Sequence, residues 1–379
     1  MKKIRAVIVG LGRIASLLED DKRREKPCTH AGAIAANPDC GLAGGCDTVE
    51  ERRQLFSERW KVPVYSDAAE MILEQKPQIL VVATHPDSHY HYCSLAASSG
   101  VPVIVCEKPL ANSLSAAKKI AALGAHRRQG RTEGKQGRTE GRQSRTAVQL
   151  PAPVILTNHE RRYSADYIKA KEILIGGKLG KILSVRAVLY MSENQRLLDV
   201  LWHDGTHLAD AIMFLTGSIL KHRRRWGAKL KGSSGTAWLE GELIKSPASP
   251  NRDPGNQPEN KTPDHKTPDH KNLTPIPVLI EAGAGRDHLV FEMEFSCAKG
   301  RLRIGNGIFE VWESVESPYA EKFRSLKLSD EIFKGPTAYF SNMIADAVAC
   351  ACEPGRQPVS SAEDGLGVIE YLDSVNSWI

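Results

Sequence analysis

Apolar residues in the first third of the chain occur in short, nearly continuous runs, and each run is followed by a polar stretch of helical character. Runs of this kind predict strands that are buried on both faces of a parallel sheet. Four such strands are expected, at residues 4–9, 41–46, 78–83 and 101–106. Helices are expected at residues 50–59, 66–75 and 91–99. Because strands alternate with helices, we predict a doubly wound α/β domain.

The pattern changes after residue 150, where short apolar segments are joined by glycine turns. These segments predict strands at residues 182–191, 288–295, 300–304 and 308–312. Helices are expected at residues 165–175, 208–215, 337–352 and 362–374. We therefore predict that the second half of the chain is an α+β domain with a mostly antiparallel open sheet.

Two segments, residues 126–150 and 244–275, show no apolar period. The first repeats Gln-Gly-Arg-Thr-Glu-Gly, and the second repeats Thr-Pro-Asp-His-Lys. Neither segment can bury enough apolar surface to offset the ~1–2 kcal/mol per residue that backbone ordering costs. We expect both to be insertions, disordered in the case of residues 244–275.

The formal net charge of +6 comes from these two insertions. Residues 126–150 hold seven basic and two acidic residues, and residues 244–275 hold five basic and four acidic residues. The rest of the 379-residue chain is formally neutral. The charge therefore gives no argument for nucleic acid as a partner.

Composition and apolar run length exclude several other classes of protein. With 41% hydrophobic residues, the chain can bury the cores of two or three domains, which excludes a disulfide-dense mini-protein and a wholly disordered chain. Its longest apolar runs are far shorter than the ~18–20 residues of a membrane helix, and no signal-peptide h-region precedes the first strand. The eight cysteines form no C-x-x-C pair and no zinc-type spacing. We expect a cytoplasmic protein with buried free thiols, no metal site and no membrane partner.

A glycine motif follows the first predicted strand. Gly10-x-Gly12-x-x-Ala15 fits a dinucleotide fingerprint, because it follows a strand and opens a predicted helix. The missing side chains would let the backbone of Gly10, Gly12, Arg13 and Ile14 approach a pyrophosphate at the helix N-terminus. A tight turn between strand and helix with no ligand is the alternative.

Asp47 stands at the end of the second predicted strand. A carboxylate there can accept hydrogen bonds from the adenosine ribose and repel a 2′-phosphate, which favours NAD over NADP. Asp47 lies 35 residues after Gly12, and we attribute the long separation to a polar surface loop at residues 19–29. Two alternatives stay open. Asp47 can instead cap the following helix, and Arg52 and Arg53 can hold a 2′-phosphate.

Three further segments are more specific than the glycines. Residues 81–89 read Val-Val-Ala-Thr-His-Pro-Asp-Ser-His, residues 106–111 read Cys-Glu-Lys-Pro-Leu-Ala, and residues 203–210 read His-Asp-Gly-Thr-His-Leu-Ala-Asp. Together with the fingerprint and with Gly-Arg-Leu-Arg-Ile-Gly at residues 300–305, they resemble the Gfo/Idh/MocA oxidoreductases, the family of glucose–fructose oxidoreductase and inositol dehydrogenase. The resemblance extends over nearly the whole chain apart from the two insertions.

The resemblance implies a domain organisation and an assembly. It implies a Rossmann domain at residues 1–125, which the basic low-complexity insertion at 126–150 separates from a substrate-binding and oligomerisation domain at 151–379. The open sheet of the second domain would form a homo-oligomer. NAD is the expected cofactor, with NADP as an alternative. The residues expected to contact it, besides the fingerprint and Asp47, are Thr84, His85, Pro86, His89, Glu107 and Lys108.

The resemblance also assigns chemical roles. Lys108 would lie beside the nicotinamide and stabilise charge on the reacting oxygen, and the Lys108–Pro109 bond is a candidate cis peptide. His207 would act as the acid/base, oriented by Asp210. His203 departs from the family pattern, because an aspartate is common at its position and Asp204 comes one residue later. Either His203 replaces that aspartate as acid/base or substrate ligand, or Asp204 reaches the site through a shifted loop.

A polar cluster at residues 158–163 completes the set of candidates. His159, Arg162 and Tyr163 are expected, like His203, to bind substrate, while a solvated cluster at the start of a helix is the alternative. The sequence thus predicts an NAD(P)-dependent oxidoreductase that transfers a hydride between nicotinamide and a CH–OH or C=O group of a sugar, inositol or similar polyol. An NAD-dependent glycoside hydrolase that oxidises its substrate transiently is an alternative. A catalytically silent dinucleotide- or sugar-sensing protein is another.

Overall fold

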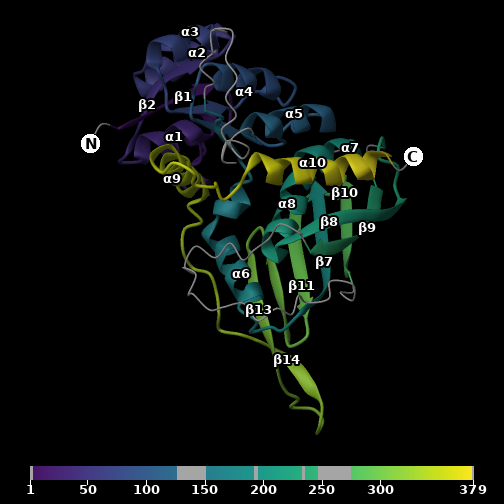
Figure 1. The fold of residues 1–379 in the computed structure, drawn as a ribbon. Coiled ribbons are helices and arrows are strands. Elements are labelled where there is room, and N and C mark those ends of the chain that lie inside the picture. Colours follow the sequence, from purple (N-terminus) through teal and green to yellow (C-terminus); the bar gives the residue numbers. More distant parts are fainter. Residues whose placement is uncertain (1–2, 126–150, 192–194, 233–234, 246–274, 378–379) are drawn as a thin grey trace, which may run out of the picture. The chain divides into compact units, whose positions relative to one another are not determined.

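A computed structural model describes residues 3–125, 151–191, 195–232, 235–245 and 275–377. These residues form two compact units (Figure 1). The first unit combines residues 1–168 with residues 334–373, and the second combines residues 169–333 with residues 374–379. Residues 151–168 and 334–373, which the sequence interpretation placed in the second domain, therefore pack with the first unit.

The first unit contains a parallel sheet of six strands. Their order across the sheet is β3 (Val64–Tyr65), β2 (Cys40–Cys46), β1 (Ile4–Val9), β4 (Ile79–Val82), β5 (Val103–Cys106) and β6 (Val154–Thr157). Every pairing between neighbours is parallel. The strand order reverses between β1 and β4, as in the Rossmann fold, so the predicted α/β class is confirmed.

Helices cover both faces of this sheet. Successive residues of β1, β4 and β5 point to opposite faces, and all four residues of β4 and of β5 are buried. The helices of this unit are α1 (His30–Ala36), α2 (Glu50–Trp60), α3 (Ala68–Gln75), α4 (His89–Ser98), α5 (Leu114–Ala125), α9 (Tyr339–Cys352), the start of α6 (Ala165–Ile175), most of α10 (Ala362–Ser377), and the short 3-10 helices η1 (Leu17–Asp20) and η2 (Glu160–Tyr163).

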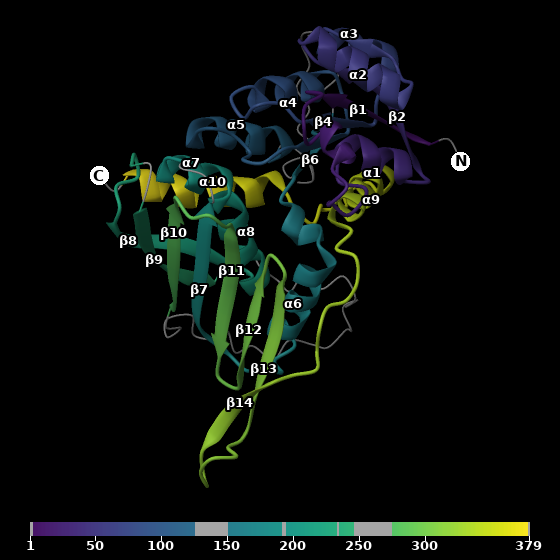
Figure 2. The same cartoon turned by 180° about the vertical axis from the view of Figure 1, so that it is seen from behind.

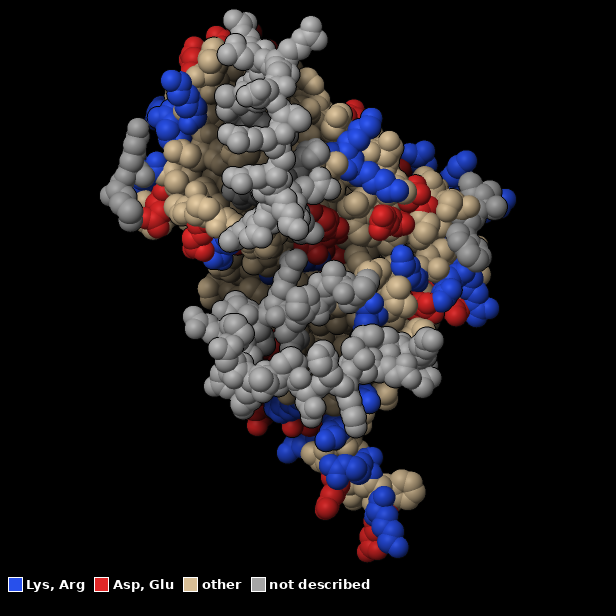
Figure 3. All heavy atoms as spheres, in the orientation of Figure 1, with Lys and Arg blue, Asp and Glu red and all other residues tan. Residues whose placement is uncertain are grey.

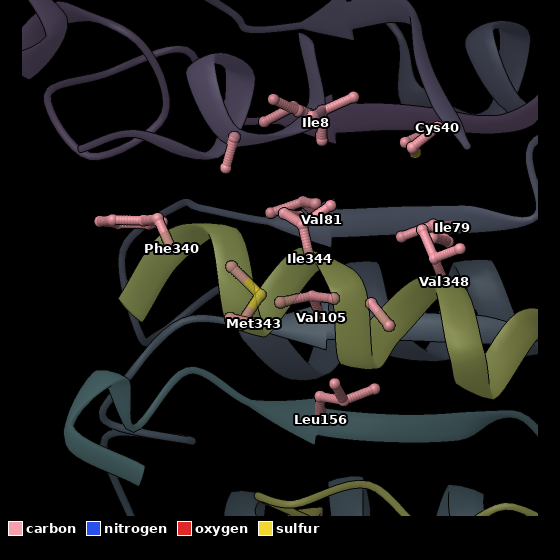
Figure 4. Packing of buried hydrophobic residues seen from close by; sticks show 14 of the residues in the cluster. Ile8, Cys40, Ile79, Val81, Val105, Leu156, Phe340, Met343, Ile344 and Val348 are labelled. Carbon is pink, nitrogen blue, oxygen red and sulfur yellow. The ribbon is translucent and has the colours of Figure 1, made fainter. Parts of the chain in front are cut away.

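One of these helices returns to the first unit from the far end of the sequence. Ile344 of α9 lies against Ile8, Val81 and Val105 of the sheet, and Met343 lies beside it (Figure 4). All five side chains are fully buried. Burying an apolar side chain of this size contributes about 1.5–3 kcal/mol. The C-terminal part of the chain is therefore part of the core of the N-terminal sheet.

The helix expected directly after the glycine motif is reduced to a single turn. The Ser16 amide donates to the Gly12 carbonyl at 3.1 Å, η1 follows, and a polar loop then leads to α1. The charged stretch after Leu18 has no apolar residues with which a helix could pack on the sheet. The Thr29 side chain accepts a hydrogen bond from the Gly32 amide and so caps α1, which corrects the predicted start of the helix to His30.

The second unit contains a mixed sheet of eight strands (Figure 2). Their order is β14 (Arg324–Leu328), β13 (Ile308–Glu316), β12 (Gly300–Gly305), β11 (Val290–Cys297), β7 (Ile182–Met191), β10 (Ile276–Ala284), β9 (Gly235–Lys245) and β8 (Ser218–Gly227). Only the β10–β7 pairing is parallel among the described strands, so the mostly antiparallel sheet is confirmed. Two helices, α7 (Leu197–His203) and α8 (Gly205–Thr216), contact its strands.

Burial alternates along the strands of the second sheet. In β11 every second residue is buried, and the residues between them are only partly covered. The partly covered positions carry ion pairs across the strands, as where Arg303 contacts Glu292 and Glu310 at 3.1 Å each. On the face of the molecule in Figure 3, basic and acidic side chains are likewise interspersed. This sheet thus has one apolar face and one charged face.

The predictions about the two insertions, the cysteines and membrane helices have different outcomes. The predicted insertion at residues 126–150 lies outside the described residues, and so do residues 246–274 of the predicted insertion at 244–275; its first two residues end β9. Seven of the eight cysteines are buried thiols, as expected, but Cys352 is exposed because it ends α9 on the side away from the core. Within the described ranges, every helix is too short or too polar to cross a lipid bilayer.

Candidate functional site

The glycine turn follows β1 at the carboxyl edge of the parallel sheet. Gly10 has a φ of +87°, and a Cβ built on it would lie 2.6 Å from the carbonyl oxygen of Ala83. Only glycine therefore fits this position. A Cβ on Gly12, in contrast, would meet no atom within 4 Å. The protein leaves the space beside Gly12 open, which fits the approach of a pyrophosphate to the backbone.

Asp47 follows β2 and binds the glycine turn. Its Oδ2 accepts a hydrogen bond from the Leu11 amide at 2.8 Å, and its Oδ1 accepts one from the Val49 amide at 2.9 Å. Val49, not Asp47, is the N-cap of α2, so the helix-cap alternative is wrong. Arg52 lies 3.6 Å from Oδ2, whereas Arg53 donates to the backbone carbonyl of Asp47. The carboxylate thus lies beside the turn, where a ribose contact requires it.

The loop after β4 contains Thr84, His85 and Pro86. His89, which follows in α4, is fully buried, and its two ring nitrogens lie 3.2 Å from the Leu110 carbonyl oxygen and 3.1 Å from that of Thr84. Burial lowers the pKa of the His89 imidazole. The ring therefore connects the loop after β4 to the loop after β5.

Lys108 lies directly after β5, in a cis peptide bond with Pro109. Its side chain is partly buried. The preceding Glu107 is buried, and its carboxylate accepts hydrogen bonds from His30 at 2.6 Å and from Asn158 at 2.7 Å. The glycine turn, the loop after β4 and Lys108 all stand at carboxyl ends of strands around the point where the strand order reverses. Open α/β sheets bind their ligands at that place.

The cluster at residues 158–163 points largely into the first unit. Arg162 is buried, and its guanidinium lies 3.1 Å from the Asp364 carboxylate. The Tyr163 hydroxyl donates to Asp346 at 3.2 Å, and its burial raises the pKa of this phenol. His159 is also buried. Arg162 and Tyr163 thus bind the returning C-terminal segment and all three side chains are buried, so the alternative of a solvated cluster is wrong.

The remaining candidates lie in the second unit. His203 ends α7 and is exposed, and its Nδ1 lies 3.0 Å from Asp204 Oδ2. His207 and Asp210 lie in α8, where both are buried. The short gap between α7 and α8 places Asp204 between the two histidines in sequence, and its carbonyl accepts a hydrogen bond from the His207 amide at 3.1 Å. The segment thus brings an exposed imidazole–carboxylate pair next to a buried imidazole.

Sequence reasoning missed two residues of the first unit, His30 and Asn158. They contact Glu107 across 77 and 51 positions of the sequence. Neither lies in a motif that names its partner, so only the fold brings them together. Among the described residues, no group of three or more His, Cys, Asp and Glu side chains is arranged to hold a metal ion.

Comparison with known proteins finds a family match in the N-terminal region. Residues 4–131 match the model of the Gfo/Idh/MocA oxidoreductase family with an NAD-binding Rossmann fold. The matched region includes the glycine turn, Asp47 and Lys108. The resemblance that the motifs indicate is therefore confirmed for this region, whose described residues form the Rossmann-type sheet.

Individual relatives match parts of the chain. The uncharacterized oxidoreductase YhhX of Escherichia coli (strain K12) is 28% identical over 138 residues, which are 36% of this chain and 32% of the relative. The D-glucoside 3-dehydrogenase of the same organism is 24% identical over 230 residues, covering 56% of this chain and 54% of the relative. The chain thus spans about a third to a half of the length of these curated relatives.

A solved structure extends the likeness in fold. The myo-inositol 2-dehydrogenase of Lactobacillus plantarum superimposes with a TM-score of 0.64 at 17% identity, covering 99% of this chain and 98% of that chain. At this identity the likeness shows the fold alone. Both units therefore have the fold of that chain.

Proposed function

We propose that this protein transfers a hydride between NAD and a CH–OH or C=O group of a sugar, inositol or similar polyol. The observation that carries the proposal is Lys108 at the carboxyl edge of a Rossmann-type sheet, the same edge that carries an open glycine turn. The family match to residues 4–131 and the relatives that are named as a glucoside and an inositol dehydrogenase support it.

The first unit would hold the cofactor. The open space beside Gly12 would admit the pyrophosphate, and the Asp47 carboxylate would accept hydrogen bonds from the ribose. Because Asp47 is anionic at that place, NAD is favoured over NADP, although Arg52 lies close enough to offset part of the charge. When bound, nicotinamide supplies the acceptor or donor of the hydride.

Lys108 would stabilise the reacting oxygen. Its ammonium group can donate a hydrogen bond to a hydroxyl or carbonyl and stabilise the negative charge that grows on the oxygen as the C–H bond breaks. A cation held in place needs little reorganisation during the reaction, so this contribution is larger than that of a solvated lysine.

His207 would transfer the hydroxyl proton of the substrate. An imidazole can take the hydroxyl proton during oxidation and return it during reduction. His203 and Asp204 would bind substrate hydroxyls or share the acid/base role, since their contact joins a donor to an acceptor at an exposed position. His159, Arg162 and Tyr163 remain candidates for substrate binding, although Arg162 and Tyr163 contact carboxylates of their own unit.

The charged face of the second sheet would form the contact between copies of this chain. Its cross-strand pairs of Arg and Glu offer both signs of charge on one surface, so the surface is complementary to itself. We expect a homo-oligomer, which light scattering coupled to size exclusion would detect.

The test of the function is a screen of cyclitols and aldoses with NAD and NADP, followed by Lys108→Ala. We expect net formation of NADH with the wild type and a loss of kcat on the order of 10²–10³-fold in the variant, as for removal of one donor to a developing oxyanion. Lys118→Ala, at an exposed position of α5, is the matched control. Full turnover by the Lys108 variant would refute the assigned role.

The same assay separates the alternatives. A glycoside hydrolase that oxidises its substrate transiently would release sugar without net NADH. A silent sensor would bind NAD and give no turnover with any substrate, and His207→Ala would then leave its behaviour unchanged.

A further inference from the structure

Glu107 connects the residues around it into one buried network. We propose that His30, Glu107 and Asn158 form a positioning network that fixes Lys108 for catalysis and ties it to the glycine turn. The inference rests on the proposed function of Lys108, and it assigns a role to two residues that no motif identifies.

The first support is the geometry at the Glu107 carboxylate. Its Oε1 accepts hydrogen bonds from His30 Nε2 at 2.6 Å and from Asn158 Nδ2 at 2.7 Å, and its Oε2 accepts one from the Lys108 amide at 3.1 Å. The exposed fractions of His30, Glu107 and Asn158 are 0%, 6% and 3%. Three donors from three chain segments thus hold one carboxylate, and one of these donors is the backbone of Lys108 itself.

The second support is the charge of Glu107. Burial alone would raise the pKa of its carboxyl group, but the hydrogen bonds and charge of His30, the hydrogen bond of Asn158 and the charge of Lys108 outweigh burial and lower the pKa. The group therefore stays ionised at neutral pH. A fixed negative charge thus lies beside the backbone of Lys108, where Glu107 Oε2 accepts the hydrogen bond of the Lys108 amide.

The third support is the anchoring of His30. Its backbone amide donates to the Ile14 carbonyl at 3.2 Å, and the next amide, of Ala31, donates to the Ala15 carbonyl at 3.0 Å. The start of α1 is therefore bonded to the turn of the dinucleotide fingerprint. The ring also contacts Phe340 of α9 edge-on, with centroids 5.2 Å apart. The imidazole is thus fixed relative to both the glycine turn and the core.

His30 acts through Glu107 and not on the substrate. With an exposed fraction of 0%, its side chain is closed off from solvent and from any ligand at the sheet edge. It is therefore a positioning residue. Its removal should change the placement and charge environment of Lys108 and leave the glycine turn able to bind NAD.

The experiment compares His30→Leu with His30→Gln in the full chain. Leucine fills the space but cannot donate, whereas the glutamine amide can donate from nearly the position of Nε2. In His30→Leu we expect kcat to fall on the order of 10–100-fold, as for a small misplacement of a catalytic group. The KM for NAD should stay within about twofold, because the contacts of the glycine turn with the cofactor remain. His30→Gln should recover most of the kcat.

A second readout does not need turnover. Each protein is treated with a limiting amine-reactive ester, and the modification of Lys108 is measured relative to that of exposed Lys118 by peptide mass spectrometry. We expect the ratio to rise several-fold in His30→Leu and in Glu107→Gln, because the loop is no longer held through Glu107 and the partly buried Lys108 becomes more accessible, and to return toward the wild-type value in His30→Gln. If His30→Leu does not fold, the labelling ratio in Glu107→Gln still tests whether the network holds Lys108.

Two outcomes would overturn the network. One is a Lys108 ratio unchanged in both His30→Leu and Glu107→Gln, and the other is equal impairment of His30→Leu and His30→Gln, which would indicate a packing role only. If the wild type turns over no substrate, the proposed function fails, while the labelling ratio still decides whether His30 and Glu107 control Lys108.

Discussion

The two sheets of this protein use their surfaces in opposite ways. The parallel sheet of the first unit is buried on both faces, so its candidate functional groups stand at the ends of its strands. The sheet of the second unit is buried on one face, and its polar side chains pair with one another along the strands. Polar groups at the strand ends are held by hydrogen bonds at the edge where open α/β sheets bind ligands, whereas those on the open face pair with one another along the strands.

The largest expected effect separates two glycines of the first unit. Gly10→Ala should cost about 3 kcal/mol or more of unfolding free energy, because the positive φ and the approach to the Ala83 carbonyl both resist a Cβ. Gly12→Ala meets no atom of the protein, so its stability should change by less than about 1 kcal/mol.

Urea unfolding measures both costs, and NAD titration gives the complementary result. Gly12→Ala should weaken NAD binding by roughly tenfold or more, since one methyl group against the pyrophosphate removes well over 1 kcal/mol of contact energy. Equal stability losses in the two variants would show that the edge of the sheet is not shaped for a ligand.

The next effect concerns the ion pair inside the first unit. Arg162→Met leaves the Asp364 carboxylate without its guanidinium, and the arginine side chain is 8% exposed. We expect a loss of about 2–3 kcal/mol, somewhat below the usual cost of breaking a fully buried pair, because Asp364 is 28% exposed. Urea unfolding followed by circular dichroism measures it, and a loss below about 0.5 kcal/mol would remove the distinction between the two units.

Acid should act on the same pair. Burial opposes ionisation of Asp364, but the charge of Arg162 and the hydrogen bonds from Ser361 outweigh burial and lower the pKa of the carboxyl group. Its stabilising contribution is therefore complete above the unfolded-state pKa of about 4 and is lost as the pH falls through the lower folded-state value. Unfolding midpoints at several pH values between about 6 and 3 should decline more steeply in the wild type than in Asp364→Asn. Parallel declines would contradict this assignment.

The smallest effect is expected on the open face of the second sheet. Arg303→Met removes contacts to Glu292 and Glu310, yet in the dissociated chain, on which the effect is measured, the arginine side chain is 30% exposed and water can replace it. We expect a loss of less than about 1 kcal/mol that shrinks further in high salt. A loss as large as that of Arg162→Met would mean that ion pairs contribute equally to the free energy of unfolding in both units.

Sequence patterns located β1, β2, β4 and β5 of the parallel sheet to within about two residues, because strands buried on both faces are continuous apolar runs. They gave no bounds for β3, which has only two residues, or for β6. The same reasoning missed β8, β9, β10 and β14 of the second unit. β8 contains a run of basic residues at positions 221–225, since one of its faces is open to solvent and its apolar residues alone are too few to mark a strand. It also missed α7, which is only seven residues long.

The candidate site divides in a similar way. Gly10, Lys108 and His207 lie in short motifs, so local order was enough to find them. His30 was hidden because a polar loop separates it from the glycine turn, and Asn158 stood in a cluster that was interpreted as substrate-binding. Their contacts with Glu107 become apparent only when the fold brings β5, β6 and α1 together.

The return of α9 to the first sheet determines when that sheet can be completed during synthesis. Ile8 and Val81 leave the ribosome early, but Ile344, which covers them, is added some 260 to 340 residues later. At about 5–20 residues per second, the nascent sheet waits on the order of tens of seconds with one apolar face uncovered. The first sheet therefore completes its core only after α9 has been synthesised, and until then one of its apolar faces is open to chaperones that bind such surfaces.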